Sequence, residues 1–389
     1  MRLGRRQLLA LPLAACTRER RRAPAALEAP TPTRAAPPPP PAPPPLRFDP
    51  ARLQVCAVSV LRWRHGRVWP SFPAVERRDV ALLDALRARG VPDVQITFVA
   101  DEQATRDGAR AALDATLARC RPADRLWFYF AGHGARDDAG RASFIPHDAT
   151  DDVAATGWNL TEIAARIRDR FRGEAVSLFA DCCASGALVQ EVLPAMRVPA
   201  SALASSQANE SSTGSWAFTD CLVDAVEGAA RLDLDGDGAV SLRDLARYAE
   251  AELAFAAQQF VAFGVAGGER DDLALGAVAR PLRAGEGERV EVAWQRRWFA
   301  GRVVERGAEG VRAHYIGYPP SQDEDVPPSR VRAPRRETLA VGTRVRVQWR
   351  RRWYPATVVD VRLGVHRIHY DDYDDTWDEW VPLDRLRAG

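Results

Sequence analysis

The chain has 389 residues and a formal net charge of +2, so it is long enough for two or three domains, and its net charge indicates no acidic partner. Every basic side chain apart from histidine is an arginine, because the sequence contains no lysine. A Walker-type phosphate loop requires a lysine and is therefore excluded. Six cysteines in a chain of this length do not make a disulfide framework, and we expect Cys56, Cys120 and Cys221 to be small core residues.

Residues 1–16 resemble a bacterial lipoprotein signal. A basic start is followed by a short apolar run, and the sequence LAAC ends at Cys16, which the resemblance makes the lipidated residue. The apolar run is too short to cross a bilayer as a helix. We therefore expect an exported protein, attached to the membrane of the cell envelope only through this anchor. The alternative is a cytoplasmic protein whose N-terminus is not a signal.

Residues 17–50 are rich first in arginine and then in proline, which is typical of an extended linker. From 51 to 280 the sequence alternates amphipathic helical segments with predicted strands, among them LQVCAVSVL, DVQITFVA, RLWFYFA and EAVSLFA. This alternation predicts an α/β fold with a mostly parallel sheet covered by helices on both faces. In such sheets the functional side chains gather beyond the carboxyl ends of the strands.

Two of these predicted strands lead into loops that carry reactive side chains. RLWFYFA is followed by GHG, with His133 at its centre, and EAVSLFA is followed by DCCASG, with Cys183. If the two strands are neighbours, the thiol and the imidazole emerge at the same edge of the sheet, where the thiol can ionise and act as a nucleophile. The backbone amides of Gly134 and Cys183 would then hold the developing oxyanion.

Residues 53–280 resemble the caspase–metacaspase family of cysteine peptidases, on the motifs FYFAGHG (128–134) and DCCASG (181–186). The resemblance implies a caspase-like fold, with Cys183 as the nucleophile, His133 as the acid/base and Cys182 facing the other way. It also implies that Asp181 and Asp79 bind a basic side chain before the scissile bond. The expected substrates are proteins or peptides cut after Arg or Lys, and the chemistry requires no cofactor.

The sequence departs from the family pattern at two positions within these motifs. Ala184 stands where metacaspases usually carry a histidine, and Ala131 stands in place of a common serine. Neither position carries the proton transfer, so the expected dyad is complete. The alternative is a catalytically inactive caspase-like scaffold that recruits a partner through its C-terminal domains.

The segment DLDGDGAVSLRD resembles a calcium-binding EF-hand loop. The ligand positions would be Asp233, Asp235, Asp237, Ala239 (through its carbonyl), Ser241 and Asp244. Asp244 is shorter than the usual bidentate glutamate, so we expect a weaker Ca²⁺ site. The alternative is an Asp/Gly-rich turn that caps the next helix. Metacaspases often bind calcium at a different acidic site, for which Asp148 is the only counterpart.

The C-terminal part is an internal repeat in which Trp349 lies 55 residues after Trp294 (349 − 294). The first repeat (286–333) and the second repeat (340–388) each predict a small SH3-like β-barrel and resemble Tudor-like or agenet-like domains. The resemblance implies an aromatic cage in the second repeat, formed by Trp353, Tyr370, Tyr373 and Trp377. In the first repeat, Gln322 and Asp325 replace Trp377 and Trp380, which indicates a degraded cage. The alternatives are that these aromatics form the barrel core, or that the arginine-rich WRRRWY binds nucleic acid, so the ligand stays open.

Overall fold

The computed structural model describes residues 49–389, apart from residues 73–76, 209–214, 296 and 336. The predicted leader, its lipidation residue Cys16 and nearly all of the linker lie outside the described residues, so these remain predictions. Among the helices of the described part, none combines the length and the apolar character needed to cross a membrane.

The centre of the N-terminal part is a six-stranded sheet with the order β10-β8-β7-β3-β1-β2. Its strands are β1 (Leu53–Ser59), β2 (Ile96–Ala100), β3 (Arg125–Ala131), β7 (Ala175–Asp181), β8 (Ala200–Ala204) and β10 (Ala262–Ala266). All neighbouring pairs are parallel except β10 with β8. The predicted mostly parallel sheet is therefore confirmed.

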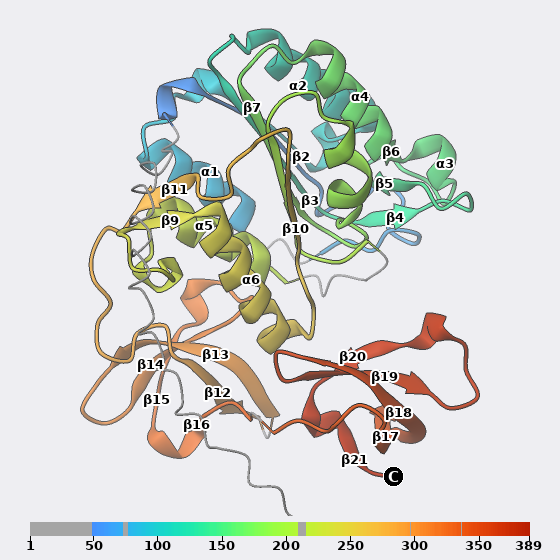
Figure 1. Cartoon of the computed structure of the whole chain (residues 1–389), viewed down its shortest axis with the longest axis vertical. Helices are drawn as coiled ribbons and strands as arrows, with labels where there is room; N and C mark the ends of the chain where they lie inside the picture. The colour runs from blue at the N-terminus through green and yellow to red at the C-terminus, as the bar shows by residue number, and fades with distance from the viewer. Residues whose placement is uncertain (1–48, 73–76, 209–214, 296, 336) are drawn as a thin grey trace, which may run out of the picture. The chain divides into compact units, whose positions relative to one another are not determined.

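Helices cover both faces of this sheet (Figure 1). On one face α2 (Arg106–Arg119) and α4 (Leu160–Arg170) pack on strand residues such as Phe128. On the other face α1 (Arg78–Ala88), α5 (Ala217–Glu227) and α6 (Leu242–Ala257) pack on residues such as Tyr129. Successive residues of a strand point to opposite faces, so the continuous apolar run of β3 supplies both cores. Cys56, Cys120 and Cys221 are buried in these cores, as expected.

Two smaller sheets and one short helix accompany the central sheet. A three-stranded sheet, formed by β4 (Gly134–Arg136), β5 (Ala142–Phe144) and β6 (Trp158–Asn159), continues the chain directly after His133. The short helix α3 (Val153–Thr156) lies between β5 and β6. The second small sheet pairs β9 (Ala239–Ser241) with β11 (Ala274–Ala277).

The two C-terminal repeats form five-stranded antiparallel sheets of equivalent strand order. The first consists of β12 (Arg289–Trp294), β13 (Arg297–Arg306), β14 (Val311–Tyr315), β15 (Glu324–Val326) and β16 (Val331–Arg332). The second consists of β17 (Arg344–Trp349), β18 (Arg352–Arg362), β19 (Val365–Tyr370), β20 (Glu379–Val381) and β21 (Leu386–Ala388). Trp294 pairs with Arg297, and Trp349 pairs with Arg352, so the hairpin register is repeated at the predicted offset.

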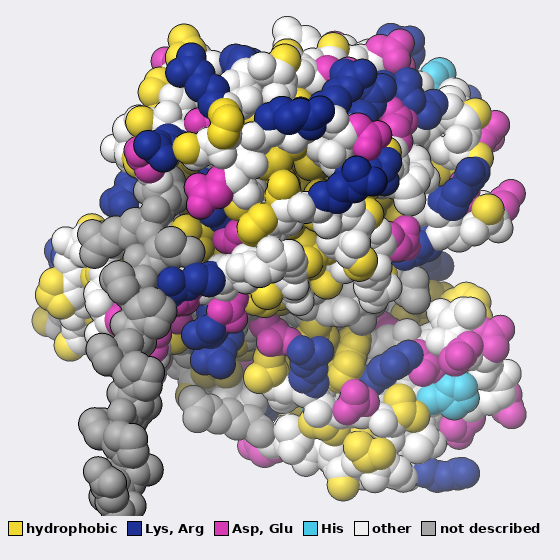
Figure 2. All heavy atoms as spheres, turned by 45° about the horizontal axis from the view of Figure 1, so that its top comes forward, with side chains coloured by type: hydrophobic (Ala, Val, Ile, Leu, Met, Phe, Trp, Pro, Cys, Tyr) yellow, Lys and Arg dark blue, Asp and Glu magenta, His cyan; other side chains and the backbone are white. Residues whose placement is uncertain are grey.

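Charges of both signs are interspersed over the face that Figure 2 shows, where arginine side chains lie beside aspartate and glutamate. Many arginines of the described residues form ion pairs, for example Arg110 with Glu162 at 2.7 Å and Arg166 with Asp114 at 2.6 Å. This mixture of signs agrees with the small net charge.

Candidate functional site

The register of the central sheet brings the two reactive loops together. β3 and β7 are adjacent and parallel, and Ala131 is paired with Asp181 at their carboxyl ends. His133 lies two residues after Ala131, and Cys183 lies two residues after Asp181. A β-carbon added to Gly134 would lie 2.1 Å from the carbonyl oxygen of Cys183, so the two loops touch where only glycine fits. The backbone of the two predicted oxyanion residues is therefore in direct contact.

A backbone carbonyl fixes the tautomer of His133. Its Nε2 lies 2.9 Å from the carbonyl oxygen of Pro70. A carbonyl can only accept a hydrogen bond, so Nε2 carries the proton, and in the neutral ring Nδ1 is the nitrogen that can take a proton from a thiol. Pro70 thereby acts as the third group that orients the base.

The loop between β1 and α1 encloses the His133 ring with aromatic side chains. The ring centroids of Trp63, Phe72 and Trp69 lie 4.3, 4.6 and 5.6 Å from that of His133. Burial lowers the pKa of His133 from its ordinary value of 6.5, while the hydrogen bond to Pro70 acts to raise it. His133 is therefore poised as a neutral base near pH 7. Sequence reasoning missed this enclosure, although the segment RWRHGRVWPSF contains three of its aromatics close together.

The two adjacent cysteines differ in their surroundings. Cys182 is 1% exposed and packs in the core, and burial raises its pKa well above the ordinary range, so it stays a thiol. Cys183 is half-buried. The following residue, Ala184, has a left-handed backbone with a φ of 54°, an unfavourable conformation for alanine that turns the chain sharply after Cys183. Ser206 holds this turn by donating to the Cys182 carbonyl at 3.0 Å.

Asp181 lies at the end of β7 as a nearly buried carboxyl group that is 8% exposed. Thr219 of α5 donates to its Oδ2 at 2.7 Å, and the Tyr129 hydroxyl lies 2.7 Å from the same Thr219 oxygen. Burial raises the pKa of Asp181 to about 6, although the hydrogen bonds from Thr219 act to lower it. Within the described part of the chain, no basic side chain forms a salt bridge with Asp181.

Asp79, the second predicted pocket residue, lies in the first turn of α1 and is 1% exposed. Its carboxylate forms a salt bridge of 2.6 Å with Arg77, which also pairs with Asp101 at 2.5 Å. Burial raises the pKa of Tyr129 well above its ordinary value; the charges of Asp181 and Asp79 also act to raise it, whereas the charge of Arg77 acts to lower it. The two carboxylates therefore lie on the same side of the sheet, around one tyrosine, together with an arginine that sequence reasoning did not include.

The acidic loop gathers three of its predicted calcium ligands. Carboxylate oxygens of Asp233, Asp235 and Asp237 lie within 4.8 Å of one another, a spacing that fits a Ca²⁺ ion. The Asp233 carboxylate accepts backbone amides of Gly236 at 2.8 Å and Gly238 at 3.0 Å. These bonds pre-shape the loop and also give the carboxylates partners without an ion.

The last two predicted side-chain ligands bind each other. Ser241 and Asp244 form a capping box at the start of α6, in which Ser241 Oγ donates to Asp244 at 2.6 Å and accepts from its amide at 3.1 Å. Ala239 belongs to β9. Full coordination would therefore require Asp244 to leave its capping role. Asp148 accepts the Arg106 amide at 2.9 Å and so caps α2.

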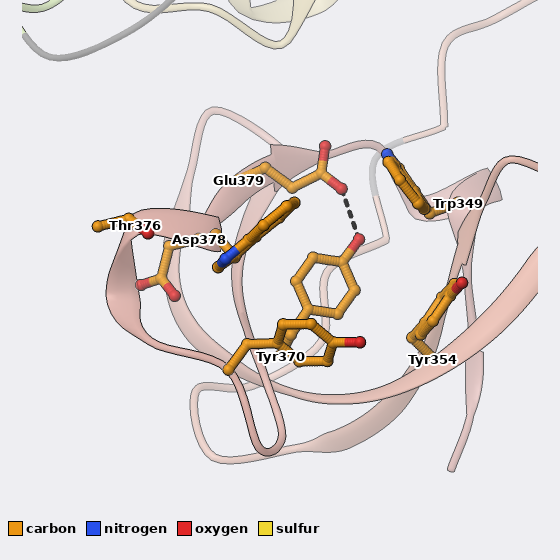
Figure 3. A pocket seen from close by; sticks show the side chains of 8 residues that line it. Trp349, Tyr354, Tyr370, Thr376, Asp378 and Glu379 are labelled. Atoms are coloured by element: carbon orange, nitrogen blue, oxygen red, sulfur yellow. Dashed lines mark hydrogen bonds between the residues drawn. The ribbon is translucent and has the colours of Figure 1, made fainter.

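The second repeat contains an aromatic pocket of about 380 Å³ between its strands and the loop before β20 (Figure 3). Aromatic side chains form most of its wall, and Asp378 and Glu379 add acidic groups; the aromatic members are Trp349, Tyr354, Tyr370, Tyr373 and Trp377. Tyr370 donates to Glu379 at 2.6 Å, the bond drawn in Figure 3. The predicted cage residues Tyr370, Tyr373 and Trp377 therefore share one pocket.

Trp353 does not line this pocket. Its ring is covered by the guanidinium of Arg387, whose central carbon lies 4.0 Å from the ring centroid. Side chains alternate along β18, so Tyr354 points into the pocket and Trp353 points away from it. Trp349 and Tyr354 take the place that sequence reasoning gave to Trp353.

The first repeat has a corresponding pocket of about 320 Å³. Each lining residue lies 55 positions before its counterpart in the second repeat: Trp294, Phe299, Tyr315, Tyr318, Ser321, Gln322, Asp323 and Glu324. Gln322 takes the position of Trp377, as predicted from the sequence. The pocket thus lacks one aromatic wall and keeps four aromatic side chains.

Comparisons with known proteins found a family match in the C-terminal part. Residues 339–388 match the Tudor-knot family, described as an RNA binding activity-knot of a chromodomain. Among solved structures, the tandem agenet domains 3–4 of ADCP1 are 22% identical, with 27% of this chain and 79% of that chain covered and a TM-score of 0.14. The agenet segment AGD34 of Arabidopsis thaliana AGDP1 is 21% identical, with 27% and 82% covered and a TM-score of 0.15. The second repeat is therefore similar to a Tudor-knot domain, and the first repeat shares its strand order.

A further solved structure covers a larger share of the chain. The protein GSU0716 of Geobacter sulfurreducens is 17% identical, with 59% of this chain and 99% of that chain covered and a TM-score of 0.43. No curated protein matches the chain significantly.

Proposed function

We propose that the protein is a cysteine endopeptidase of the caspase–metacaspase type that cleaves proteins or peptides after a basic residue. One observation carries this proposal: His133 and Cys183 follow neighbouring parallel strands at the same level, and their loops are in contact at Gly134. The buried Cys182 is excluded from the role of nucleophile by its raised pKa.

In the proposed reaction, Nδ1 of His133 takes the proton of the Cys183 thiol, and the thiolate attacks the peptide carbonyl. The backbone amides of Gly134 and Cys183 stabilise the negative oxygen. The imidazolium then protonates the leaving amine, which leaves an acyl-enzyme for water to hydrolyse. The carbonyl of Pro70 keeps the ring oriented and stabilises the imidazolium through the 2.9 Å bond to Nε2.

The preference for a basic side chain rests on Asp181. A buried carboxyl group two residues before the nucleophile, whose pKa is raised rather than lowered, is stabilised by an incoming cation. Calcium binding at Asp233, Asp235 and Asp237, and export through a lipid anchor at Cys16, belong to the same proposal.

The test uses residues 46–389 with fluorogenic peptides that end in Arg, Lys or Asp, each with and without calcium. We expect Cys183→Ala to abolish cleavage of the Arg and Lys peptides. The matched variant Cys182→Ala should retain it, with a small loss of stability of about 1 kcal/mol from the buried sulfur. Equal loss of activity in both variants would refute the assignment of Cys183.

The second candidate function is a scaffold without peptidase activity that recruits a partner through the Tudor-like barrels. It is favoured by the exposed rings of Trp377, Tyr373 and Trp349 around the pocket of the second repeat. These aromatic faces suit a methylated ammonium or guanidinium group. A folded protein that cuts none of the peptides, and whose Cys183 is not preferentially alkylated, would support this function instead.

A further inference from the structure

One of the two carboxylates predicted to bind the substrate, that of Asp79, is already paired with a cation of the chain itself, Arg77. The Arg77 guanidinium donates hydrogen bonds to two carboxylates and one hydroxyl. Its Nη2 lies 2.6 Å from Asp79 and 3.0 Å from the Ser59 hydroxyl, and its Nη1 lies 2.5 Å from Asp101. The Arg77 side chain is 19% exposed, so these charge-assisted bonds are partly shielded from water.

The oxygens of Asp79 have further partners. Oδ1 accepts the Val80 amide at 2.9 Å and Arg77 Nε at 3.1 Å, while Oδ2 accepts Arg77 Nη2. A carboxylate that is 1% exposed and bonded in this way has little capacity left for a second guanidinium. The two carboxylates predicted to bind the substrate are therefore not equivalent, because Asp79 is paired with Arg77 and Asp181 forms no salt bridge within the described residues.

We propose that Arg77 determines the specificity of the pocket by holding Asp79, so that Asp181 alone receives the basic side chain of the substrate. This inference rests on the proposed peptidase function. A single carboxylate whose Oδ2 is already bonded to Thr219 recognises one positive charge and does not clamp a planar guanidinium from two sides. The substrate class is therefore any peptide with one positive charge before the scissile bond, and Arg and Lys peptides are cut at similar rates.

The test compares the ratio of kcat/KM for the Arg and Lys peptides in four proteins: wild type, Arg77→Gln, Arg77→Gln/Asp79→Asn and Arg77→Lys. Arg77→Gln frees Asp79 and should raise the Arg-to-Lys ratio about tenfold, the equivalent of one added charge-assisted pair. The double variant removes both charges of the pair, and Arg77→Lys keeps the cation. Both should retain the wild-type ratio near one.

Far-UV circular dichroism and urea midpoints establish that each variant is folded. If Arg77→Gln does not fold, the double variant and Arg77→Lys still decide the question. The inference is overturned if the folded Arg77→Gln variant keeps the wild-type ratio. It is also overturned if the double variant loses its preference for basic over neutral peptides, because Asp79 would then contact the substrate. Wild-type protein that cuts no peptide and shows no selective alkylation of Cys183 would instead refute the peptidase function.

Discussion

Replacing Asp181 with asparagine should stabilise the protein at neutral pH. The folded-state pKa of Asp181 is raised from its ordinary value of 3.8 to about 6, so the folded state holds this proton more tightly than the unfolded chain does. The Asp181 carboxyl group therefore destabilises the folded state least below pH 3.8. The free energy of unfolding falls as the pH rises toward and through 6. A difference of about two pH units corresponds to about 3 kcal/mol.

The assay is urea unfolding of wild type and Asp181→Asn at pH values from 4 to 7.5. We expect the two proteins to be similarly stable near pH 4, and the variant to be more stable at pH 7 by up to about 3 kcal/mol. The hydrogen bond from Thr219 is retained, because the asparagine carbonyl oxygen can accept it. Activity on Arg and Lys peptides should fall in the same variant.

Asp224 provides a control with the opposite sign. Burial acts to raise its pKa, but the charges of Arg231 and Arg302 outweigh burial and lower it. Its stabilising contribution is therefore present at neutral pH and is lost as the pH falls through the lowered value, so Asp224→Asn should destabilise the protein most at pH 7. Unfolding curves of Asp181→Asn that run parallel to those of wild type at every pH would refute the reasoning about Asp181.

Three further predictions concern the other sites. Trp377→Ala should weaken binding of a trimethyl-lysine peptide about tenfold in isothermal titration calorimetry, because one cation–π wall is lost, while Trp353→Ala should leave the Kd unchanged; equal losses would contradict the pocket. Calcium should raise the Tm of wild type and not that of Asp233→Asn, and chelation should reverse the shift. A wild-type Tm that does not change on addition of calcium would contradict the site. Arg302→Met should lower the free energy of unfolding by about 3 kcal/mol in urea, because it removes a partner 3.2 Å from the fully buried Glu252; a loss below about 1 kcal/mol would show that Arg289 alone neutralises Glu252.

The sequence was sufficient to predict the sheet edge at which the site lies. Continuous apolar runs identify buried parallel strands, and the carboxyl ends of parallel neighbours share one edge, so RLWFYFA followed by GHG and EAVSLFA followed by DCCASG point to one place. The groups around His133 could not be predicted in the same way. Pro70 and Trp63 belong to an irregular loop with no hydrophobic period, and only tertiary contacts bring that loop onto the imidazole.

The pairing of Arg77 and the aromatic pocket show two other reasons for incomplete prediction. Arg77 is two residues from Asp79, but its bond to Asp101 depends on the end of β2, which is distant in sequence. The prediction that Trp353 belongs to the cage was wrong, because it considered only that the residue is aromatic. It did not consider to which side of the strand the side chain points. Val345 and Val347 are buried on one side of β17, and Trp349 continues that alternation, so the sequence did contain the signal for a pocket wall.

The two repeats retain the same pocket and differ in how they contact the rest of the chain. Trp380 of the second repeat packs on Phe260, with ring centroids 4.6 Å apart, and the first repeat has Asp325 at that position. Arg302 of the first repeat is buried against Asp224 and Glu252, and the second repeat has Thr357 there. Four aromatic lining residues of one pocket have an aromatic counterpart 55 positions away in the other pocket. The side chains with which the two repeats contact the rest of the chain, in contrast, differ. Aromatics needed only for packing in the interior would not have to be exposed, and Trp294 and Trp349 are exposed. Retention of exposed rings in both copies therefore favours a binding role for both pockets. The affinities of the two pockets should differ because the first has Gln322 where the second has Trp377.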